Sequence, residues 1–147
     1  MSKEEKLIIY TDGACSGNPG HSGVGIVLCD ESGSIIKKYY RYIGQTTNNI
    51  AEYMAFVFAL QESLFNNVRH VTVYSDSELM VRQMNGIYKV KNQNILLLYQ
   101  IAENLKKHFN YFKIEYIERE KNKEADRLAR KGAKLKGKNM SKNEDES

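Results

Sequence analysis

The chain lacks tryptophan, has one proline and two cysteines, and contains no long apolar run among its 147 residues. A membrane helix needs about 18 consecutive apolar residues, so the sequence predicts no membrane association. The N-terminal sequence MSKEEKLIIY has charges where a secretion signal would have its apolar stretch, which favours a cytoplasmic protein. Cys15 and Cys29 lack the spacing of metal ligands, and we expect reduced thiols in that compartment.

The size and composition suit one globular domain, because 41% of the residues are hydrophobic and can form a sizeable core. The formal net charge is +4, and ten of the 22 Lys and Arg residues lie between Arg119 and Lys142. This basic segment suits either a solvated helix or a phosphate-rich partner. The end of the chain has almost no apolar residues, so we expect a domain over residues 1–135 and a disordered tail over residues 136–147.

The secondary structure is predicted from the periodicity of the apolar residues. Five β-rich runs predict strands at Leu7–Thr11, Val24–Cys29, Ile35–Ile43, Val71–Ser75 and Ile114–Ile117. Helical spacing or strong helix formers predict helices at 50–64, 77–85, 95–109 and 123–134. Asp30–Gly33 suits a tight reversal, and the glycine-rich segment Gly13–Gly23 predicts a loop. The order βββαβααβα indicates an α/β fold in which three antiparallel strands precede a helical crossover, so strands one and four can be parallel neighbours.

Two aspartates occupy equivalent places at the ends of predicted strands. Asp12 ends the first strand and is followed by glycine, and Asp76 ends the fourth strand where a helix begins. Parallel neighbouring strands would bring both carboxylates to one edge of the sheet, where α/β proteins hold their sites. Glu52 lies one turn into its helix, on the side that carries Ala55 and Phe56, and a carboxylate on a packed face needs a partner.

Each acidic residue also has a structural interpretation. Asp76 could cap a helix, Glu52 could close a capping box with Asn49, and Asp126 could pair with Arg130. Together, however, these residues would gather several anions at one end of a sheet, which is unfavourable unless cations are present. The candidate ligands are all oxygen atoms and no His or Cys cluster accompanies them, which favours magnesium or manganese over zinc.

Four segments resemble the type 1 ribonuclease H family, and the resemblance runs from about Leu7 to Ala133. The segments are YTDGACSGNPG around Asp12, TTNNIAEYMA around Glu52, VYSDSELMVRQMNG around Asp76 and NKEADRLARKGA around Asp126. The resemblance implies a ribonuclease H-like fold, with a five-stranded mixed sheet of three antiparallel strands plus two parallel strands, flanked by helices. It also implies an endonuclease that hydrolyses the RNA strand of RNA/DNA hybrids and leaves 5′-phosphate and 3′-hydroxyl ends.

The same resemblance implies roles for individual residues. The four acidic residues would be catalytic and would hold two Mg²⁺ ions, for which Mn²⁺ could substitute, without a covalent nucleophile. The implied contacts are Gly13, Asn18, Asn48 and Glu78 along the minor groove of the RNA strand, and Thr47 and Asn49 near the DNA strand. Amides and backbone groups suit 2′-hydroxyls, although each polar residue could instead only satisfy a turn. Glu78 stands where the family commonly has glutamine.

Two further features depart from the family pattern. Gly86–Asn92 leads directly onward, so the basic, tryptophan-bearing protrusion of some members is absent. The loop before Asp126 has Arg119, Glu120 and Lys121 where many members have a histidine. If proton transfer or product release needs a group in this loop, Glu120 is the candidate, and its alternative is a solvated surface carboxylate.

Two other functions are compatible with the same fold. One is a hybrid-binding module with weak or lost catalysis, in which at least one carboxylate would be expected to be missing. The other is a different nuclease of the same fold, because fold alone does not set the substrate. All four carboxylates are present, so we expect a nuclease whose partner is an RNA/DNA hybrid, acting as a monomer without an obligate protein partner.

Overall fold

The computed structural model describes residues 5–136 and 141–144. Its strands are β1 (Lys6–Ser16), β2 (Gly20–Cys29), β3 (Ile35–Thr46), β4 (His70–Ser75), β5 (Tyr111–Tyr116) and β6 (Ser141–Glu144). Its helices are α1 (Asn48–Phe65), α2 (Glu78–Met84), α3 (Gln93–Lys106) and α4 (Lys123–Leu135), with a short 3-10 helix η1 at Arg119–Lys121. The predicted order βββαβααβα is therefore confirmed through residue 135.

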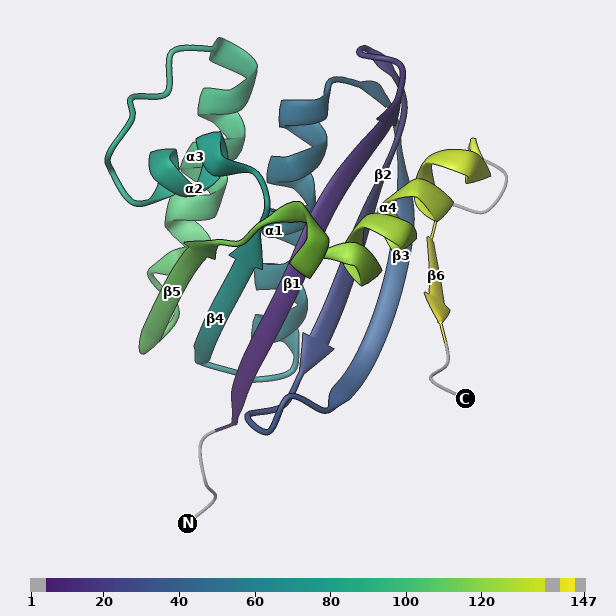
Figure 1. Ribbon diagram of the computed structural model, residues 1–147. Helices are drawn as coiled ribbons and strands as arrows, with labels where there is room; N and C mark the ends of the chain where they lie inside the picture. Colours follow the sequence, from purple (N-terminus) through teal and green to yellow (C-terminus); the bar gives the residue numbers. More distant parts are fainter. Residues whose placement is uncertain (1–4, 137–140, 145–147) are drawn as a thin grey trace.

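The strands form one mixed sheet in the order β5-β4-β1-β2-β3-β6. β1, β2 and β3 are antiparallel neighbours, whereas β4 pairs in parallel with both β1 and β5. The predicted sheet of three antiparallel and two parallel strands is thus confirmed, and β1 and β4 are the parallel neighbours that the crossover allowed. Figure 1 shows α1 behind this sheet and α4 in front of it.

The glycine-rich segment is mostly strand, which corrects the loop predicted over Gly13–Gly23. Only Gly17–Pro19 connects β1 to β2. The glycines are needed for close packing of helices on the sheet: a Cβ at Gly13 would lie 2.3 Å from the carbonyl carbon of Ala51 in α1. On the other face, a Cβ at Gly25 would lie 2.2 Å from the carbonyl oxygen of Ala125 in α4.

The end of the described chain differs from the predicted disordered tail. Ser141–Glu144 form β6, which pairs antiparallel with β3 from Lys38 to Arg41. Without β6 this side of β3 would be an open sheet edge, and main-chain hydrogen bonds to such an edge need no apolar side chains. The rest of the predicted tail beyond Lys136, residues 137–140 and 145–147, lies outside the described residues.

Apolar side chains fill both faces of the sheet. The larger core lies between the sheet and α1, where Ile9, Val73, Phe56 and Leu60 are buried. A smaller cluster around Leu128 lies beneath α4. No helix in the described part of the chain is long and apolar enough to span a membrane.

Candidate active site

Asp12 does not end its strand as predicted, because β1 continues to Ser16. It does follow the last residue of β1 that pairs with β4, so Asp12 and Asp76 lie at the same place in the sheet, as the parallel pairing predicted. Thr11 of β1 pairs with Ser75 of β4, and each is followed directly by an aspartate, Asp12 or Asp76. Asp76 does not cap α2, because Ser77 is the N-cap residue and its side chain accepts the N–H of Met80. The carboxylate of Asp76 is therefore available at the sheet edge.

Glu52 is held toward β1 by a hydrogen bond from the backbone of Gly13, and it does not cap its own helix. Thr47 caps α1, since its hydroxyl accepts the N–H of Ile50 at 3.3 Å. The backbone N–H of Gly13 donates to Oε1 of Glu52 at 3.0 Å. The capping box with Asn49 is thus wrong, and Glu52 projects from the packed side of α1 into the space beside Asp12.

The acidic residues form one cluster. Asp12, Glu52 and Asp76 each offer an oxygen atom, and these oxygens all lie within 4.8 Å of one another. Asp126, in the first turn of α4, is buried, and its carboxyl group is close enough to Asp12 to raise the pKa of Asp12. All four carboxylates line one cleft of about 730 Å³. Asp126 also pairs with Arg130, so its predicted structural role and its place in the cluster coexist.

Burial and mutual repulsion perturb this cluster strongly. Burial raises the pKa of Asp12 to about 11, and the charges of Glu52 and Asp76 add to the rise. Burial also raises the pKa of Glu52 to about 8, with Asp76 acting in the same direction. Burial acts to raise the pKa of Asp126 as well, but its interactions with Arg130 and Asp12 and the positive charge of Arg119 together lower that pKa.

This electrostatic pattern fits a divalent cation. Without one, Asp12 and Glu52 retain protons near neutral pH, because four adjacent carboxylates cannot all be charged in a buried site. A bound cation removes that repulsion and allows the carboxylates to ionise. The oxygen-only ligand set suits a hard ion such as Mg²⁺.

The cleft also holds two cationic groups, neither of which was predicted as a site residue. Arg119 and Arg130 line the cleft together with Tyr116 and Cys15. Burial raises the pKa of Glu52, and the positive charge of Arg119 partly offsets that rise. The sequence signals for Arg119 were its place at the start of the basic segment and in the loop where the family often has histidine.

Asn122 is a further residue that sequence reasoning missed. Its side chain is 2% exposed, and its Nδ2 donates to the carbonyl oxygen of Thr11 at 2.9 Å. It occupies the N-cap position of α4, but its side chain makes no cap hydrogen bond to the helix. Only the folded chain shows that this residue contacts β1 beside Asp12.

The predicted substrate residues divide into two groups. Gly13 and Asn48 line the cleft, and Asn18 lies beside it because its Oδ1 accepts the N–H of Asn48 at 3.0 Å. Thr47 caps α1 and does not line the cleft. Asn49 and Glu78 are exposed and do not line the cleft, and the same holds for the predicted loop group Glu120.

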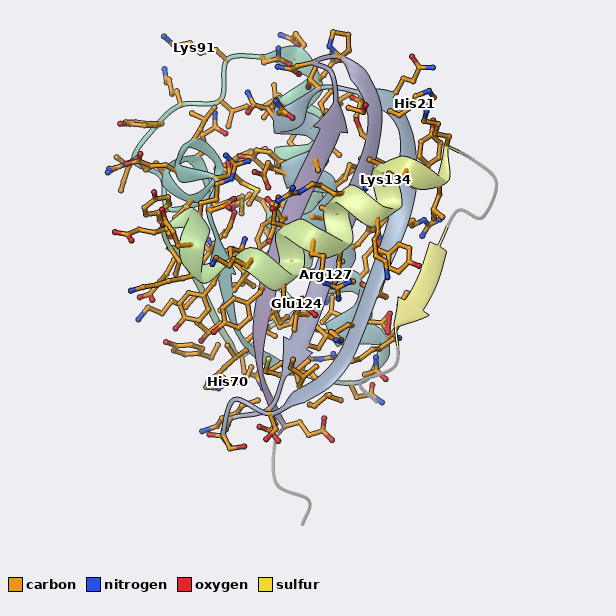
Figure 2. The ribbon with its side chains drawn as sticks, turned by 45° about the vertical axis from the view of Figure 1, so that its right-hand side comes forward. His21, His70, Lys91, Glu124, Arg127 and Lys134 are labelled. Carbon is orange, nitrogen blue, oxygen red and sulfur yellow. The ribbon has the colours of Figure 1, made fainter. Side chains whose placement is uncertain are left out.

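The exposed members have other surroundings. Glu78 pairs with Arg82 one turn along α2, with 2.8 Å between Oε2 and a guanidinium nitrogen. Glu120 lies in η1 on the surface. No histidine lines the cleft, and Figure 2 shows His21 and His70 at opposite ends of the sheet. The predicted absence of a protrusion is confirmed, since residues 85–92 connect α2 to α3 without another helix.

The basic segment near the C-terminus is partly neutralised in the fold. Glu124 accepts hydrogen bonds from Lys38 and Arg127, and Figure 2 shows Glu124 and Arg127 close together near the start of α4. Lys134 lies farther along the same helix. The helix therefore presents a mixed surface near its start and a basic one toward its end.

Comparisons with known proteins agree with this geometry. A family model described as reverse transcriptase-like matches residues 10–132. The bifunctional protein Rv2228c of Mycobacterium tuberculosis is 36% identical over 125 residues, which are 84% of this chain and 34% of that protein. The chain thus spans about a third of the length of this relative.

Solved structures resemble the chain over nearly its whole length. The N-terminal ribonuclease H domain of Rv2228c has a TM-score of 0.87 at 33% identity, covering 92% of this chain and 98% of that chain. LC11 ribonuclease H1 in complex with an RNA/DNA hybrid has a TM-score of 0.82 at 40% identity, covering 87% and 96%. The chain therefore belongs to the reverse transcriptase-like family, and its fold is that of the type 1 ribonuclease H enzymes.

Proposed function

We propose that this protein is a ribonuclease H that hydrolyses the RNA strand of RNA/DNA hybrids and leaves 5′-phosphate and 3′-hydroxyl ends. The observation that carries the proposal is the cluster of Asp12, Glu52 and Asp76, whose oxygens lie within 4.8 Å of one another. Asp126 completes the set in the same cleft. The hybrid bound by LC11 ribonuclease H1, at 40% identity, supports the choice of substrate.

The four carboxylates would hold two Mg²⁺ ions, and Mn²⁺ could take their place. When bound, the ions would activate a water molecule and neutralise charge that develops on the leaving 3′ oxygen. The surrounding residues orient the ligands: the N–H of Gly13 fixes Glu52, and the guanidinium of Arg130 fixes Asp126. Such partners keep each carboxylate pointed into the cleft before substrate arrives.

Recognition of RNA is proposed for the neutral edge of the cleft. The side chain of Asn48 and the backbone of Gly13 line it, and Asn18 holds the start of α1 in place through the N–H of Asn48. Amide groups both donate and accept hydrogen bonds, so they can select a 2′-hydroxyl. Thr47, Asn49 and Glu78 stay predicted contacts, and Glu120 stays the predicted loop group.

A single chain supplies the complete acidic cluster, since β1, α1, β4 and α4 each contribute one carboxylate. We therefore propose that the protein acts as a monomer on its hybrid substrate. A cytoplasmic location stays a prediction from the sequence.

A substrate panel tests the proposed function. End-labelled RNA/DNA, RNA/RNA, DNA/DNA and single-stranded RNA are incubated with the protein and either Mg²⁺ or a chelator. We expect cleavage of the RNA strand of RNA/DNA with Mg²⁺, none with chelator, and RNA fragments that carry 5′-phosphates.

Two variants separate the proposed site from general damage to the fold. Asp76→Asn should reduce cleavage at least about a hundredfold, because losing a carboxylate that would hold metal costs several kcal/mol of transition-state stabilisation. The matched control is Asp30→Asn, whose carboxylate accepts hydrogen bonds in the exposed β2–β3 turn, and it should cleave like the wild type. Binding of hybrid without cleavage by the wild type would instead identify a binding module.

A further inference from the structure

We propose that Asn122 is the positioning residue that attaches the segment carrying Arg119 to the catalytic edge of the sheet and so sets the place of Asp126. The inference rests on the proposed function and adds to it a residue that contacts neither the phosphate nor the metal. Its basis is a buried hydrogen bond of 2.9 Å from Nδ2 of Asn122 to the carbonyl oxygen of Thr11, which joins residues 111 positions apart.

The segment between β5 and α4 crosses over β4 and β1, as Figure 1 shows. It is attached to both strands. The N–H of Ile117 donates to the carbonyl of Ser75 at 2.9 Å, and Asn122 donates to Thr11. Thr11 and Ser75 are paired across the sheet, and each directly precedes a metal-site aspartate. The two attachments therefore fix this segment against the residues that present Asp12 and Asp76.

The backbone of Asn122 links the same attachment to the other side of the cleft. Its N–H donates to the carbonyl of Arg119 at 3.0 Å and closes η1. Its carbonyl accepts the N–H of Asp126 at 3.1 Å in the first turn of α4. One residue thus connects the strand that carries Asp12, the turn that carries Arg119 and the helix that carries Asp126.

A role in capping α4 does not explain this side chain. Asparagine is a favoured N-cap residue, yet here the side chain makes no cap hydrogen bond and reaches the strand instead. Its Oδ1 is buried and has no hydrogen-bond partner among the described residues, which is unfavourable. The amide of Asn122 is therefore buried at a cost in stability, and its one hydrogen bond among the described residues is the bond from Nδ2 to Thr11.

The matched control is Asn85. Its Nδ2 donates to the carbonyl of Ile114 in β5 at 3.2 Å, so it makes the same kind of bond between an amide side chain and a strand, away from the cleft. Asn85→Ala removes this bond at a site that is not part of the acidic cluster. It should lower thermal stability and leave catalysis and Mg²⁺ binding unchanged.

The test compares Asn122→Ala, Asn122→Ser and Asn85→Ala with the wild type in three measurements. These are Mg²⁺ affinity by calorimetry without substrate, kcat and KM on RNA/DNA hybrid, and melting temperature in chelator. For Asn122→Ala we expect Mg²⁺ affinity and kcat to fall by about 10- to 100-fold, as for other partners of metal ligands, with KM within about threefold. Serine, like asparagine, is a favoured N-cap residue. Asn122→Ser should therefore show the same losses if the role of Asn122 is positioning and not capping.

Two outcomes would overturn the proposal. One is that Asn122→Ala keeps Mg²⁺ affinity and kcat near wild type and loses only stability, as Asn85→Ala should. The other is that Asn122→Ser recovers both quantities. If Asn122→Ala does not fold, Asn122→Ser decides alone. Failure of the wild type to cleave hybrid would reject the proposed function, and the Mg²⁺ affinities would still test the positioning role.

Discussion

The backbone N–H of Gly13 donates a 3.0 Å hydrogen bond to Oε1 of Glu52 and thereby joins β1 to α1 beside Asp12. The bond forms because Gly13 has no side chain: a Cβ there would lie 2.3 Å from the carbonyl carbon of Ala51. Close approach of helix and strand thus places a carboxylate of α1 in a cluster with the carboxylates of two strands.

The first prediction follows from this contact. Gly13→Ala should destabilise the protein by about 1 to 3 kcal/mol, because the added methyl group forces α1 away from β1. The same displacement moves Glu52, so Mg²⁺ binding should weaken as well. Thermal melts and calorimetric Mg²⁺ titrations of the folded variant measure both effects. An unchanged melting temperature would mean that α1 can shift without cost.

Glu52→Gln is the companion to that variant. The amide oxygen can still accept the N–H of Gly13, so the fold should be kept, whereas the charge that the metal needs is lost. We expect a melting temperature in chelator that equals or exceeds the wild-type value, together with loss of hybrid cleavage. A variant that unfolds would show that the carboxylate charge itself supports the structure.

The second prediction concerns Asp12→Asn. Cleavage should fall to less than about a hundredth of the wild-type rate, because a carboxylate proposed to hold metal is lost. Stability in chelator should rise by on the order of 2 kcal/mol at neutral pH, because burial and the neighbouring charges raise the pKa of Asp12 and oppose its ionisation. Denaturant melts in chelator measure the gain, and a loss of stability would contradict the electrostatic account.

The third prediction is a pH dependence whose direction follows from the raised pKa values. The pKa of Glu52 rises from 4.5 to about 8 on folding, and that of Asp12 rises from 3.8 to about 11. When the pKa of a carboxyl group is higher in the folded state than in the unfolded state, its contribution to stability is fully present at a pH below the unfolded-state pKa. That contribution is lost as the pH rises toward the folded-state pKa. Metal-free stability should therefore fall between about pH 4 and pH 8.

Magnesium should reverse this trend. Mg²⁺ binds the ionised carboxylates, so the increase in melting temperature that it causes should grow with pH over the same interval. Melts from pH 5.5 to 8.5 with Mg²⁺ and with chelator measure the difference, and Asp12→Asn should reduce it. An increase in melting temperature that is independent of pH would argue against binding at the cluster.

Much of this site was predictable because the signals are local. The helix cap at Ser77 and the parallel pairing of β1 with β4 follow from residue types and spacing, and they predicted that Asp12 and Asp76 lie together. Asp126 was assigned to the same site only through the resemblance to ribonuclease H. Other features depend on contacts between distant segments. The glycines near Gly13 suggested a turn, but they serve close packing, which only the folded chain shows. The strand pairing of β6 likewise has no signal in its polar sequence.

The fourth prediction is that no histidine takes part in catalysis. Replacing His21, His70 and His108 together with alanine should leave the hybrid-cleavage rate within a few-fold of wild type, since none lines the cleft. Loss of a true general acid or base would cost about 10²- to 10⁴-fold. The pH–rate profile should therefore lack an inflection near an imidazole pKa of about 6.5.

Arg119 is the cationic loop residue that lines the cleft in place of a histidine. Arg119→Ala should lower kcat by about tenfold or more, because a positive group near the phosphate site stabilises developing charge. Glu120→Gln tests the alternative loop group that the sequence suggested, and it is the matched exposed neighbour. If Glu120→Gln lowers the rate and Arg119→Ala does not, the roles are reversed.

The central claim is that the four carboxylates form a site for two cations that bracket the scissile phosphate. Crystals of the wild-type or Asp76→Asn protein with an RNA/DNA hybrid whose scissile phosphate cannot be hydrolysed, soaked in Mn²⁺, allow the ions to be located by anomalous diffraction. The account predicts two Mn²⁺ peaks roughly 3.5 to 4 Å apart in the wild-type cleft, touching Asp12, Glu52, Asp76 and Asp126. It predicts a weakened or missing peak in Asp76→Asn. Ions bound elsewhere, with the cluster left without metal while hybrid is in place, would contradict it.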